Sequence, residues 1–488
     1  MYFAAILGIG FFFRGRSRSV EGFTAAGRSL PGWLTGLSIL GTYVSSISFL
    51  AAPGKSFADN WNPFVFSLSL PIATWIAVRY FLPFYRQSRY VSAYHHLEER
   101  FGAWARGYAS TCYLLTQLAR MGTVMYLMAL PMSVLLGRDT GLVILITGIL
   151  VTIYTFLGGI TAVIWTDAVQ TVILIIGALV CAGLMVFGLP EGPGQLFEIA
   201  GEADKFSLGD FGASIALPTF WVTLVYGLFI NLNNFGIDQN YVQRYVASSS
   251  DREARKSVWL GGLLYVPVSA IFFFIGTALF AYYTANPGDL PADLAGQPDR
   301  VFPWFIVSKL PAGITGLLIA AVFAAAMSTV STSLNSSATI LLNDFYQRYI
   351  RRDADEAHSM RFILRATIVW GVLGTGIALA MTQARSALDA WWSLAGILSG
   401  GMLGLFLLGI MVPKAKGRAA LPATLIGVTI ILWMTLSPAL AWWPDSLRSP
   451  FHNFLVIVFG TTAILLTGFI FTVLMTRSSG NPNGDSPT

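Results

Sequence analysis

The feature that most constrains this chain is its succession of long apolar stretches separated by short polar loops. Hydrophobic residues make up 55% of its 488 residues and charged residues only 11%, whereas a typical soluble domain carries about 25% charged residues. An α-helix needs about 20 apolar residues to cross roughly 30 Å of hydrocarbon, and a helix satisfies its own backbone there. The sequence therefore predicts an all-α polytopic membrane protein.

We expect about 13 transmembrane helices. The first stretch, Met1–Phe13, is shorter than a full span. It lacks both the preceding positive charges and the following cleavage site of a signal peptide, so we interpret it as a truncated first span. The predicted spans are 1–13, 31–52, 63–85, 106–136, 140–157, 160–189, 214–236, 256–284, 312–343, 362–382, 388–412, 419–438 and 451–476.

Lysine and arginine gather in every second loop, and this alternation supports the span count. By the positive-inside rule we expect the N-terminus outside and the C-terminus in the cytoplasm. The last residues, 477–488, are predicted to form a disordered tail. We expect the chain to be a multi-pass protein of the cell inner membrane. The net charge of +6 therefore does not indicate a nucleic-acid partner. The basic residues are Arg14, Arg16, Arg18, Arg28, Arg86, Arg89, Arg100, Arg244, Arg252, Arg255, Lys256, Arg348, Arg351, Arg352, Arg361, Lys414, Lys416 and Arg418.

No linker divides residues 1–476, so we expect one transmembrane domain. Two of its spans are interrupted by polar residues, and each begins a five-span block, 31–189 or 214–412; segments 1–13, 419–438 and 451–476 flank these blocks. Paired broken helices are typical of inverted-repeat transporters with a midplane site, although polar packing faces would give the same pattern. The interrupting residues are Gly41, Thr42, Ser45, Ser46 and Ser48 in one span and Asn231, Asn233, Asn234 and Gly236 in the other.

Gly316–Ser337 combines an apolar half with a row of hydroxyls, in which five of the six residues from Ser328 to Ser333 are Ser or Thr. Ser328, Ser331 and Thr332 share one helical face, with Ala325 and Thr329 on the neighbouring face. Such a helix offers uncharged oxygen ligands to a monovalent cation. Alternatively, the hydroxyls bond back to carbonyls of the same helix or pack against neighbouring helices.

Two charges lie well inside predicted spans. Arg120 costs about 2.5–3.5 kcal/mol at membrane depth on insertion scales, and its planar fork suits a carboxylate; a fixed partner inside the bundle is the alternative. Asp167 follows the Gly158-Gly159 turn and is either a charged sodium ligand or a group near the membrane surface. Asp238 and Arg244 are predicted to form a structural or gating pair at a cytoplasmic end.

Enzyme chemistry has little support in the sequence. The two cysteines lie in apolar segments, the four histidines show no metal-ligand spacing, and no phosphate-binding loop or nucleophile elbow is present. A channel would need a continuous ring of ligands, and a sensor would need a signalling domain. A transporter is the function class that the pattern favours.

Four stretches resemble the sodium:solute symporters, and the resemblance covers nearly the whole chain: TYVSSISFLAAPGKSF, FLGGITAVIWTDAVQ, DQNYVQRYV and AAVFAAAMSTVSTSLNSS. The sequence is most similar to the bacterial sialic acid transporters, through GGITAVIWTD, the ADKF at 203–206 and Arg120. This resemblance implies a LeuT-type 5+5 inverted repeat and alternating access.

The resemblance also implies site residues. A first Na⁺ would bind Gly41, Val44, Ala325, Ser328 and Thr329. A second Na⁺ would bind Asp167, Ser328, Ser331 and Thr332. Arg120 would bind a substrate carboxylate, and Tyr43, Ser45, Ser48 and Ser67 would complete the substrate site. Tyr43, Pro63 and Ser67 depart from the Thr, Phe and Gln that the resemblance leads us to expect.

These observations predict a Na⁺-coupled secondary active symporter, functional as a monomer in the lipid bilayer, that imports a small organic acid, with sialic acid or a related sugar acid favoured and two Na⁺ per substrate. The alternative substrate is a neutral sugar, proline or a monocarboxylate.

Overall fold

The computed structural model describes residues 8, 12, 19–88, 90–292, 294, 296–383, 387–440 and 442–479. These residues form helices and, apart from an isolated bridge between Leu30 and Ser248, no β-structure. The main helices are α2 (Val20–Ala25), α3 (Gly32–Tyr43), α4 (Ala52–Ala58), α5 (Val65–Leu68), α6 (Leu70–Ile76), α7 (Leu82–Ser88), α8 (His95–Phe101), α9 (Ala103–Leu136), α10 (Thr140–Phe187), α11 (Pro193–Glu202), α12 (Phe220–Ile237), α13 (Gln239–Ala247), α14 (Asp251–Ala285), α15 (Pro298–Ser308), α16 (Ala312–Ile340), α17 (Glu356–Met381), α18 (Ala387–Met411), α19 (Gly417–Ala439) and α20 (Leu455–Ser479). Short π-helical or 3-10 turns continue or join them, among them η3 (Ile47–Ala51), η4 (Asn62–Phe64), η5 (Ala77–Phe81) and η7 (Leu341–Ile350).

Twelve of the predicted spans have a counterpart in the described part of the chain. Eleven helices are long and apolar enough to cross a membrane singly, and the bent pair α3–α4 makes a twelfth span. The predicted first span, 1–13, lies outside the described residues except for Gly8 and Phe12. Helix α20 extends to Ser479, three residues past the predicted end of the last span, and 480–488 of the predicted tail is not described.

The break predicted in the second span is confirmed. Helix α3 ends at Tyr43 because Val44 adopts an extended conformation (φ −81°, ψ 112°), and the chain resumes as the π-helical turn η3 followed by α4. The two halves are bent by 56°. The hydroxyl of Ser45 accepts the backbone N–H of Ile47 at 3.2 Å, so a side chain replaces a missing backbone partner at the start of the second half.

The break predicted in the seventh span lies elsewhere. The first residues of that predicted span, 214–219, are not helical, and α12 is continuous through Asn231 and Gly236 up to Ile237. Only Asp238 is extended, where it caps α13 by accepting the N–H of Asn240 at 2.7 Å. The Asn231 side chain bonds to a neighbouring helix instead of unwinding its own, because it donates to Ser69 at 2.9 Å.

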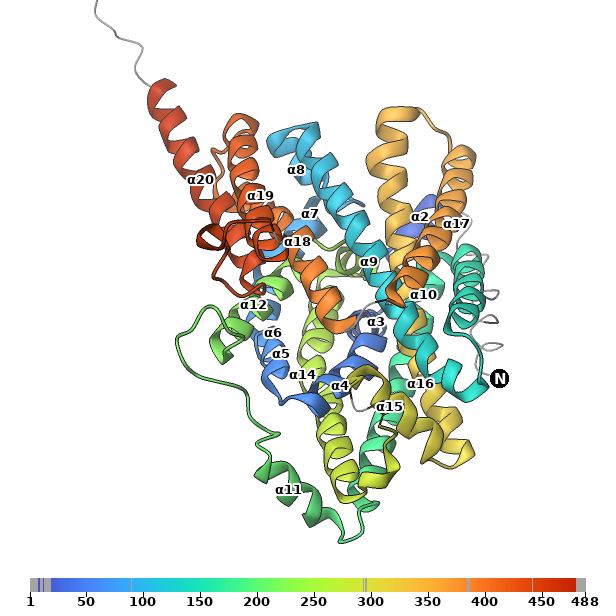
Figure 1. Cartoon of the computed structure of the whole chain (residues 1–488). Helices are drawn as coiled ribbons and strands as arrows, with labels where there is room; N and C mark the ends of the chain where they lie inside the picture. The colour runs from blue at the N-terminus through green and yellow to red at the C-terminus, as the bar shows by residue number, and fades with distance from the viewer. Residues whose placement is uncertain are drawn as a thin grey trace, which may run out of the picture.

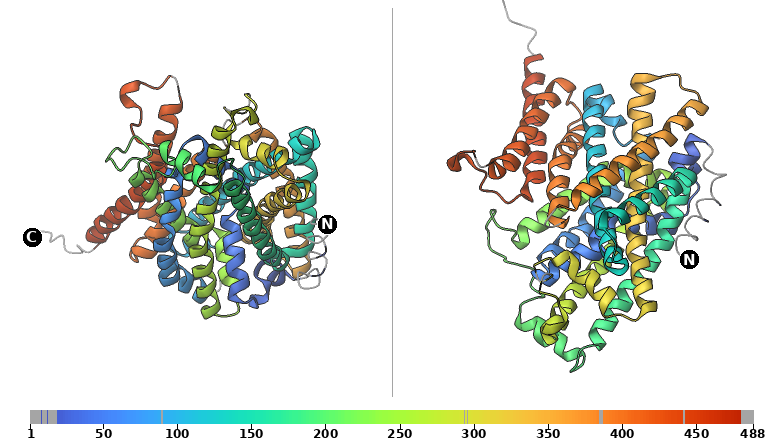
Figure 2. Two further views of the ribbon diagram at one scale, coloured as in Figure 1. Left: turned by 90° about the horizontal axis from the view of Figure 1, so that it is seen from below. Right: turned by 45° about the vertical axis from the view of Figure 1, so that its right-hand side comes forward.

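Helix α16 lies at the centre of the bundle. It packs against α10, α9, α17 and α3, and every residue from Ala321 to Ile340 is buried. Figures 1 and 2 show the surrounding helices and place the ends of α8 and α20 and the η7–α17 turn at one end of the molecule, with α11 at the other. Helix α10 contains two spans joined at Gly159, whose backbone (φ 55°, ψ −165°) is accessible essentially to glycine alone.

Candidate substrate and sodium sites

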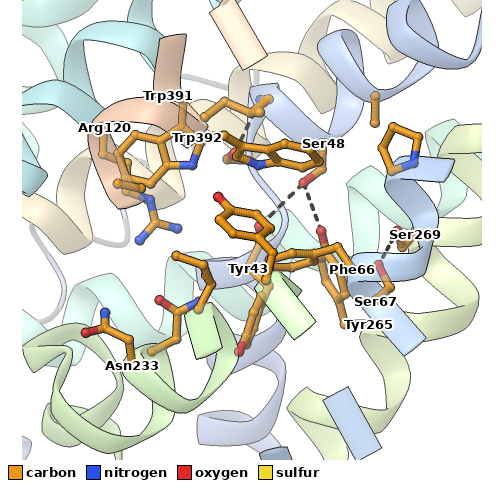
Figure 3. A pocket seen from close by; sticks show the side chains of 18 of the residues that line it. Tyr43, Ser48, Phe66, Ser67, Arg120, Asn233, Tyr265, Ser269, Trp391 and Trp392 are labelled. Carbon is orange, nitrogen blue, oxygen red and sulfur yellow. Dashed lines mark hydrogen bonds between the residues drawn. The ribbon is translucent and has the colours of Figure 1, made fainter. Parts of the chain in front are cut away.

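A pocket opens beside the break between α3 and η3. Its walls come from α3 and η3, from the segment η4–α5, and from α9, α12, α14 and α18. All five predicted substrate residues line it, namely Tyr43, Ser45, Ser48, Ser67 and Arg120. Figure 3 shows Arg120 on one side of the pocket and the Ser48 and Ser67 hydroxyls on the other. The sequence therefore identified residues that do share one cavity.

Arg120 is 9% exposed, and among the described residues its guanidinium has one hydrogen-bond acceptor and one aromatic neighbour. One N–H donates to the carbonyl of Thr42 in the last turn of α3, and the guanidinium carbon lies 6.0 Å from the ring centroid of Trp391. A carbonyl uses one of the five guanidinium donors, so the fork retains donors that point into the pocket. The alternative prediction of a fixed carbonyl partner thus holds for one N–H, and the remaining donors are free to bind an anion.

All three positions that depart from the expected residue types, Tyr43, Pro63 and Ser67, line the pocket, and two of them, Tyr43 and Ser67, bond to other side chains. The Tyr43 ring packs against Phe235, Tyr241 and Tyr265, with ring centroids 5.0–5.7 Å apart, and its hydroxyl lies 3.2 Å from the Asn231 carbonyl oxygen. Ser67 donates to Ser269 at 2.9 Å. Ser48 lies 3.4 Å from the Tyr265 hydroxyl, so this side of the pocket carries a chain of hydroxyl groups.

Sequence reasoning missed several pocket residues. Asn233 is 5% exposed, and its side-chain oxygen Oδ1 has no hydrogen-bond partner in the described structure. Trp391 and Trp392 form an aromatic wall, which the consecutive tryptophans of the eleventh span could have suggested. Asp238 also lines the pocket. Because Arg120 and Asp238 both line it, the pocket offers a cation and an anion to a bound solute.

The residues of the predicted first Na⁺ site meet where α3 ends against α16. The Ser328 hydroxyl lies 3.4 Å from the Gly41 carbonyl, and the Thr329 hydroxyl donates to the Ala325 carbonyl at 3.2 Å. Val44, at the end of α3, is 1% exposed. The last carbonyls of a helix lack an intrahelical partner and carry partial negative charge. A set of buried, uncharged oxygens at a helix end fits a monovalent cation.

Asp167 is fully buried at the meeting point of α3, α10, α13 and α16, which excludes the alternative of a group near the surface. One carboxylate oxygen accepts from Ser328 at 2.7 Å. The other accepts from Ser38 at 2.6 Å and from the Arg244 guanidinium at 2.7 Å. An ionised carboxylate offers about four acceptor positions, so these three bonds leave room for one further donor or cation.

The predicted pairing of Asp238 with Arg244 is wrong. Arg244 is 0% exposed and forms its ion pair with Asp167, while also donating to Ser38, to Thr332 and to the Asn240 carbonyl. Asp167, Ser328 and Thr332 therefore lie close together, as the predicted second site requires, but the Arg244 guanidinium bonds to Asp167 and Thr332. Ser331, the fourth predicted ligand, donates to the carbonyl of Ser328 at 3.1 Å, as the back-bonding alternative proposed.

Beyond Thr332 the polar face of α16 is bonded to neighbouring helices. Ser333 donates to Gln117 on α9 at 2.7 Å, and Ser336 donates to Asn240 on α13 at 2.6 Å. The last turn reaches Asp344 in η7, which pairs with Arg106 and accepts from Ser110 at 2.5 Å. These contacts close the half of the molecule that carries α8 and the η7–α17 turn.

The opposite end carries the ADKF segment. The Lys205 ammonium donates to the carbonyls of Phe57 and Asp59, each at 2.7 Å, and lies 4.1 Å from the ring centroid of Phe280. Burial lowers the pKa of Lys205, and Asp59 partly opposes this shift. The lysine thus ties the segment after α11 to the end of α4, the second half of the broken span.

We compared the sequence and fold of this chain with those of known proteins. The model of the sodium:solute symporter family matches residues 23–427. The sodium/sialic acid symporter NanT of Aliivibrio fischeri is 33% identical over 96% of this chain and 91% of its own length. The sodium-coupled monocarboxylate transporter 2 of Mus musculus is 28% identical over 91% of this chain and 72% of its own.

A solved structure supports the same assignment. The substrate-bound, outward-open Na⁺-coupled sialic acid symporter superimposes with a TM-score of 0.88 and 32% identity, over 97% of this chain and 96% of that one. The fold is the LeuT-type arrangement expected from the sequence. This protein belongs to the sodium:solute symporter family and is a sodium-coupled transporter of the membrane, not an enzyme.

Proposed function

We propose that this transporter imports a small carboxylated solute, sialic acid or a related sugar acid, together with Na⁺. The observation that carries the proposal is Arg120, a buried guanidinium with free donors directed into a pocket that hydroxyl side chains also line. Asp238 lines the same pocket and partly offsets this charge, but among the described residues no acidic side chain forms an ion pair with Arg120. A buried charge without a directly bonded anion is costly, and the substrate carboxylate would supply that partner. The relatives described above are named for sialic acid and for monocarboxylates, both of which carry a carboxylate.

A monocarboxylate smaller than a sugar acid is the second candidate. Ser67 is shorter than the glutamine expected there, and its hydroxyl already bonds Ser269. Apolar side chains of Phe66, Phe272 and Trp391 occupy much of the remaining wall. Fewer free polar groups in the pocket would favour a smaller and less polyhydroxylated acid.

For the coupling ions we propose two sites. The first comprises Gly41, Val44, Ala325, Ser328 and Thr329, and the second comprises Asp167, Ser328, Ser331 and Thr332. The 3.4 Å contact of Ser328 with Gly41 and its 2.7 Å bond to Asp167 support this arrangement, because one hydroxyl then touches both groups of ligands. Two Na⁺ would accompany each substrate.

We also propose that the end carrying α8 and the η7–α17 turn faces the cytoplasm of a cell whose inner membrane holds the protein. The N-terminus would lie outside and the C-terminus inside. The basic loops support this orientation, because Arg100, Arg348 and Lys414 belong to that end while Glu198 and Glu202 lie on α11. The pocket and proposed ion sites are built within one chain, which supports a functional monomer.

Uptake into proteoliposomes tests the substrate class. Uptake of a radiolabelled sugar acid should require an inward Na⁺ gradient and fall to background when choline or K⁺ replaces Na⁺. In a panel of sialic acid, a short monocarboxylate, proline and a neutral sugar, the neutral sugar should fail to compete because it has no carboxylate. The relative competition by the three carboxylated compounds then identifies the substrate class. An amide or ester of the transported acid should fail to compete, because it cannot pair with the guanidinium.

Variants of Arg120 test its role in the same assay. Arg120→Ala should weaken apparent affinity on the order of a hundredfold, equivalent to about 3 kcal/mol for a charge-assisted bidentate contact. Arg120→Lys should be almost as damaging, because an ammonium cannot form two parallel bonds. Arg138→Lys, in the exposed turn after α9, is the control and should leave affinity unchanged. Equal competition by a neutral sugar, together with normal affinity in Arg120→Ala, would make Arg120 structural.

A further inference from the structure

An open groove runs along the outer surface of the bundle between the start of α3 and the first half of α14. It encloses about 1010 Å³, whereas a water molecule in the liquid takes up roughly 30 Å³. Its walls are Gly32 and Trp33 of α3 and, on α14, Asp251, Arg252, Arg255, Lys256, Trp259, Leu260, Leu263, Leu264 and Pro267. This groove lies outside the substrate pocket and shares no residue with it.

The groove is polar at one end and apolar at the other. Along α14 its lining changes from Arg252 and Arg255 through Trp259 to Leu263 and Pro267. At 1.5 Å rise per residue, the distance from Arg255 to Pro267 is about 18 Å, close to half of a hydrocarbon core of about 30 Å. Trp33, Leu260 and Leu263 are 53%, 37% and 43% exposed in the bundle, so they face the membrane. The change from basic to apolar lining along α14 therefore matches the change from headgroup to acyl chain in one leaflet of a bilayer.

The basic rim is only partly neutralised by the protein, because its two acidic residues, Asp251 and Glu253, are paired with other cations although Glu253 also feels the charge of Arg252. Asp251 accepts from Arg86 at 2.7 Å, and Glu253 is bonded to Lys256 at 2.7 Å. Among the described residues, no acidic side chain forms an ion pair with Arg252 or Arg255. Two guanidinium groups therefore remain available at the level where lipid phosphates lie.

A second, smaller groove continues from the first. Arg255 and Trp259 line both, and Trp75, Val78, Arg79 and Pro83 complete the second. Trp75 is 53% exposed, and tryptophan is enriched at the interface between membrane and water. Arg79 adds a third guanidinium to those of Arg252 and Arg255, and two adjoining grooves provide room for two acyl chains.

We propose that these grooves bind one anionic phospholipid, with its phosphate held by Arg252 and Arg255 and its chains along Trp259 and Leu263. The excess of positive charge favours this occupant over a second copy of the chain, because a two-fold symmetric contact would place the same cations against each other. The lipid would contact the start of α3. The first N–H of this helix, at Gly32, donates to the Glu253 carboxylate on α14 at 2.7 Å. The site would thus connect membrane composition to the broken helix that lines the substrate pocket.

Native mass spectrometry of the purified full chain tests the proposal. The protein in detergent is titrated with phosphatidylglycerol and, separately, with phosphatidylethanolamine of the same acyl chains. Wild type should retain one bound phosphatidylglycerol. The double variant Arg252→Gln/Arg255→Gln should bind phosphatidylglycerol at least tenfold more weakly than wild type does. The control Arg351→Gln/Arg352→Gln removes the same charge from the exposed turn before α17 and should retain the lipid.

Two further arms identify the ligand. Glycerol phosphate, the headgroup chemistry without chains, should not displace bound phosphatidylglycerol at comparable concentration; displacement would assign the site to a soluble phosphate instead. Equal retention of phosphatidylethanolamine would remove the role of headgroup charge. Unchanged phosphatidylglycerol binding in Arg252→Gln/Arg255→Gln, in a variant that elutes as a single species, would overturn the proposal.

Discussion

At the scale of single residues, the proposed role of Asp167 as a sodium ligand can be tested through the sodium dependence of uptake. If Asp167 belongs to a second site, the Na⁺ dependence of uptake should be sigmoidal, with a Hill coefficient above one. Asp167→Asn and Ser331→Ala each remove a proposed ligand and should lower that coefficient towards one or raise the Na⁺ requirement. Initial rates measured over a range of Na⁺ concentrations provide the check.

The control for these variants is Ser333→Ala, on the same helix. Ser333 is as buried as Ser331 but bonds Gln117, so its loss should leave the Hill coefficient unchanged. Because Asp167→Asn also leaves Arg244 without its partner, at a cost of about 3–5 kcal/mol for a buried pair, its thermal unfolding should be compared with that of Asp167→Asn/Arg244→Gln. A hyperbolic wild type, unaffected by Asp167→Asn, would leave only the first site.

Sequence reasoning identified Asp167 and Arg244 but could not assign their partners. The two residues are 77 positions apart, and their contact depends on how α13 packs across α3 and α10. Ser38 was missed for the same reason: a lone hydroxyl in an apolar helix gives no signal until the neighbouring carboxylate is placed beside it. The grouping of Tyr43, Ser45 and Ser48 in one pocket was easier to predict, since these residues lie on one local break.

At the scale of an element, the junction inside α10 depends on Gly159. The Gly159 backbone lies in a region that residues with a Cβ rarely adopt, so alanine at this position would be strained. We expect Gly159→Ala to lower the free energy of unfolding by about 1–3 kcal/mol. Gly183→Ala is the matched control on the same helix, with open space where its Cβ would be, and alanine there should be neutral or slightly stabilising. Thermal unfolding in detergent measures both, and equal midpoints would contradict the prediction.

The elements themselves were largely predictable, because the length of an apolar stretch determines whether it can span the membrane. The exact ends of the spans were less predictable. The seventh span begins at Phe220, not at 214. The position of its break was also misjudged, since the polarity of Asn231 suggested an unwound helix. In the structure that side chain bonds Ser69 and the Tyr43 hydroxyl, contacts between helices that the sequence does not reveal.

At the scale of the whole molecule, the pocket lies between two unequal ends. Towards α8, the side chains of α9, α13 and α16 interlock through Gln117, Asn240 and Ser336 and end in the Arg106–Asp344 pair. Towards α11, the pocket adjoins a second cavity with which it shares Pro63 and Trp392. The pocket is thus more tightly bonded on the side of the basic loops than on the side of α11.

The buried pair of Asp167 and Arg244 has an electrical consequence. Its two charges cancel, and Arg120 and Asp238 are likewise opposite in sign, so the ligand-free carrier should reorient with little charge displaced across the membrane field. The loaded carrier, with two Na⁺ and one carboxylate, would move one net positive charge, worth about 2.3 kcal/mol per 100 mV, or roughly fiftyfold in accumulation. In proteoliposomes clamped with K⁺ and valinomycin, an inside-negative voltage should therefore raise solute accumulation, whereas voltage-independent accumulation would mean that cargo crosses with its charges balanced.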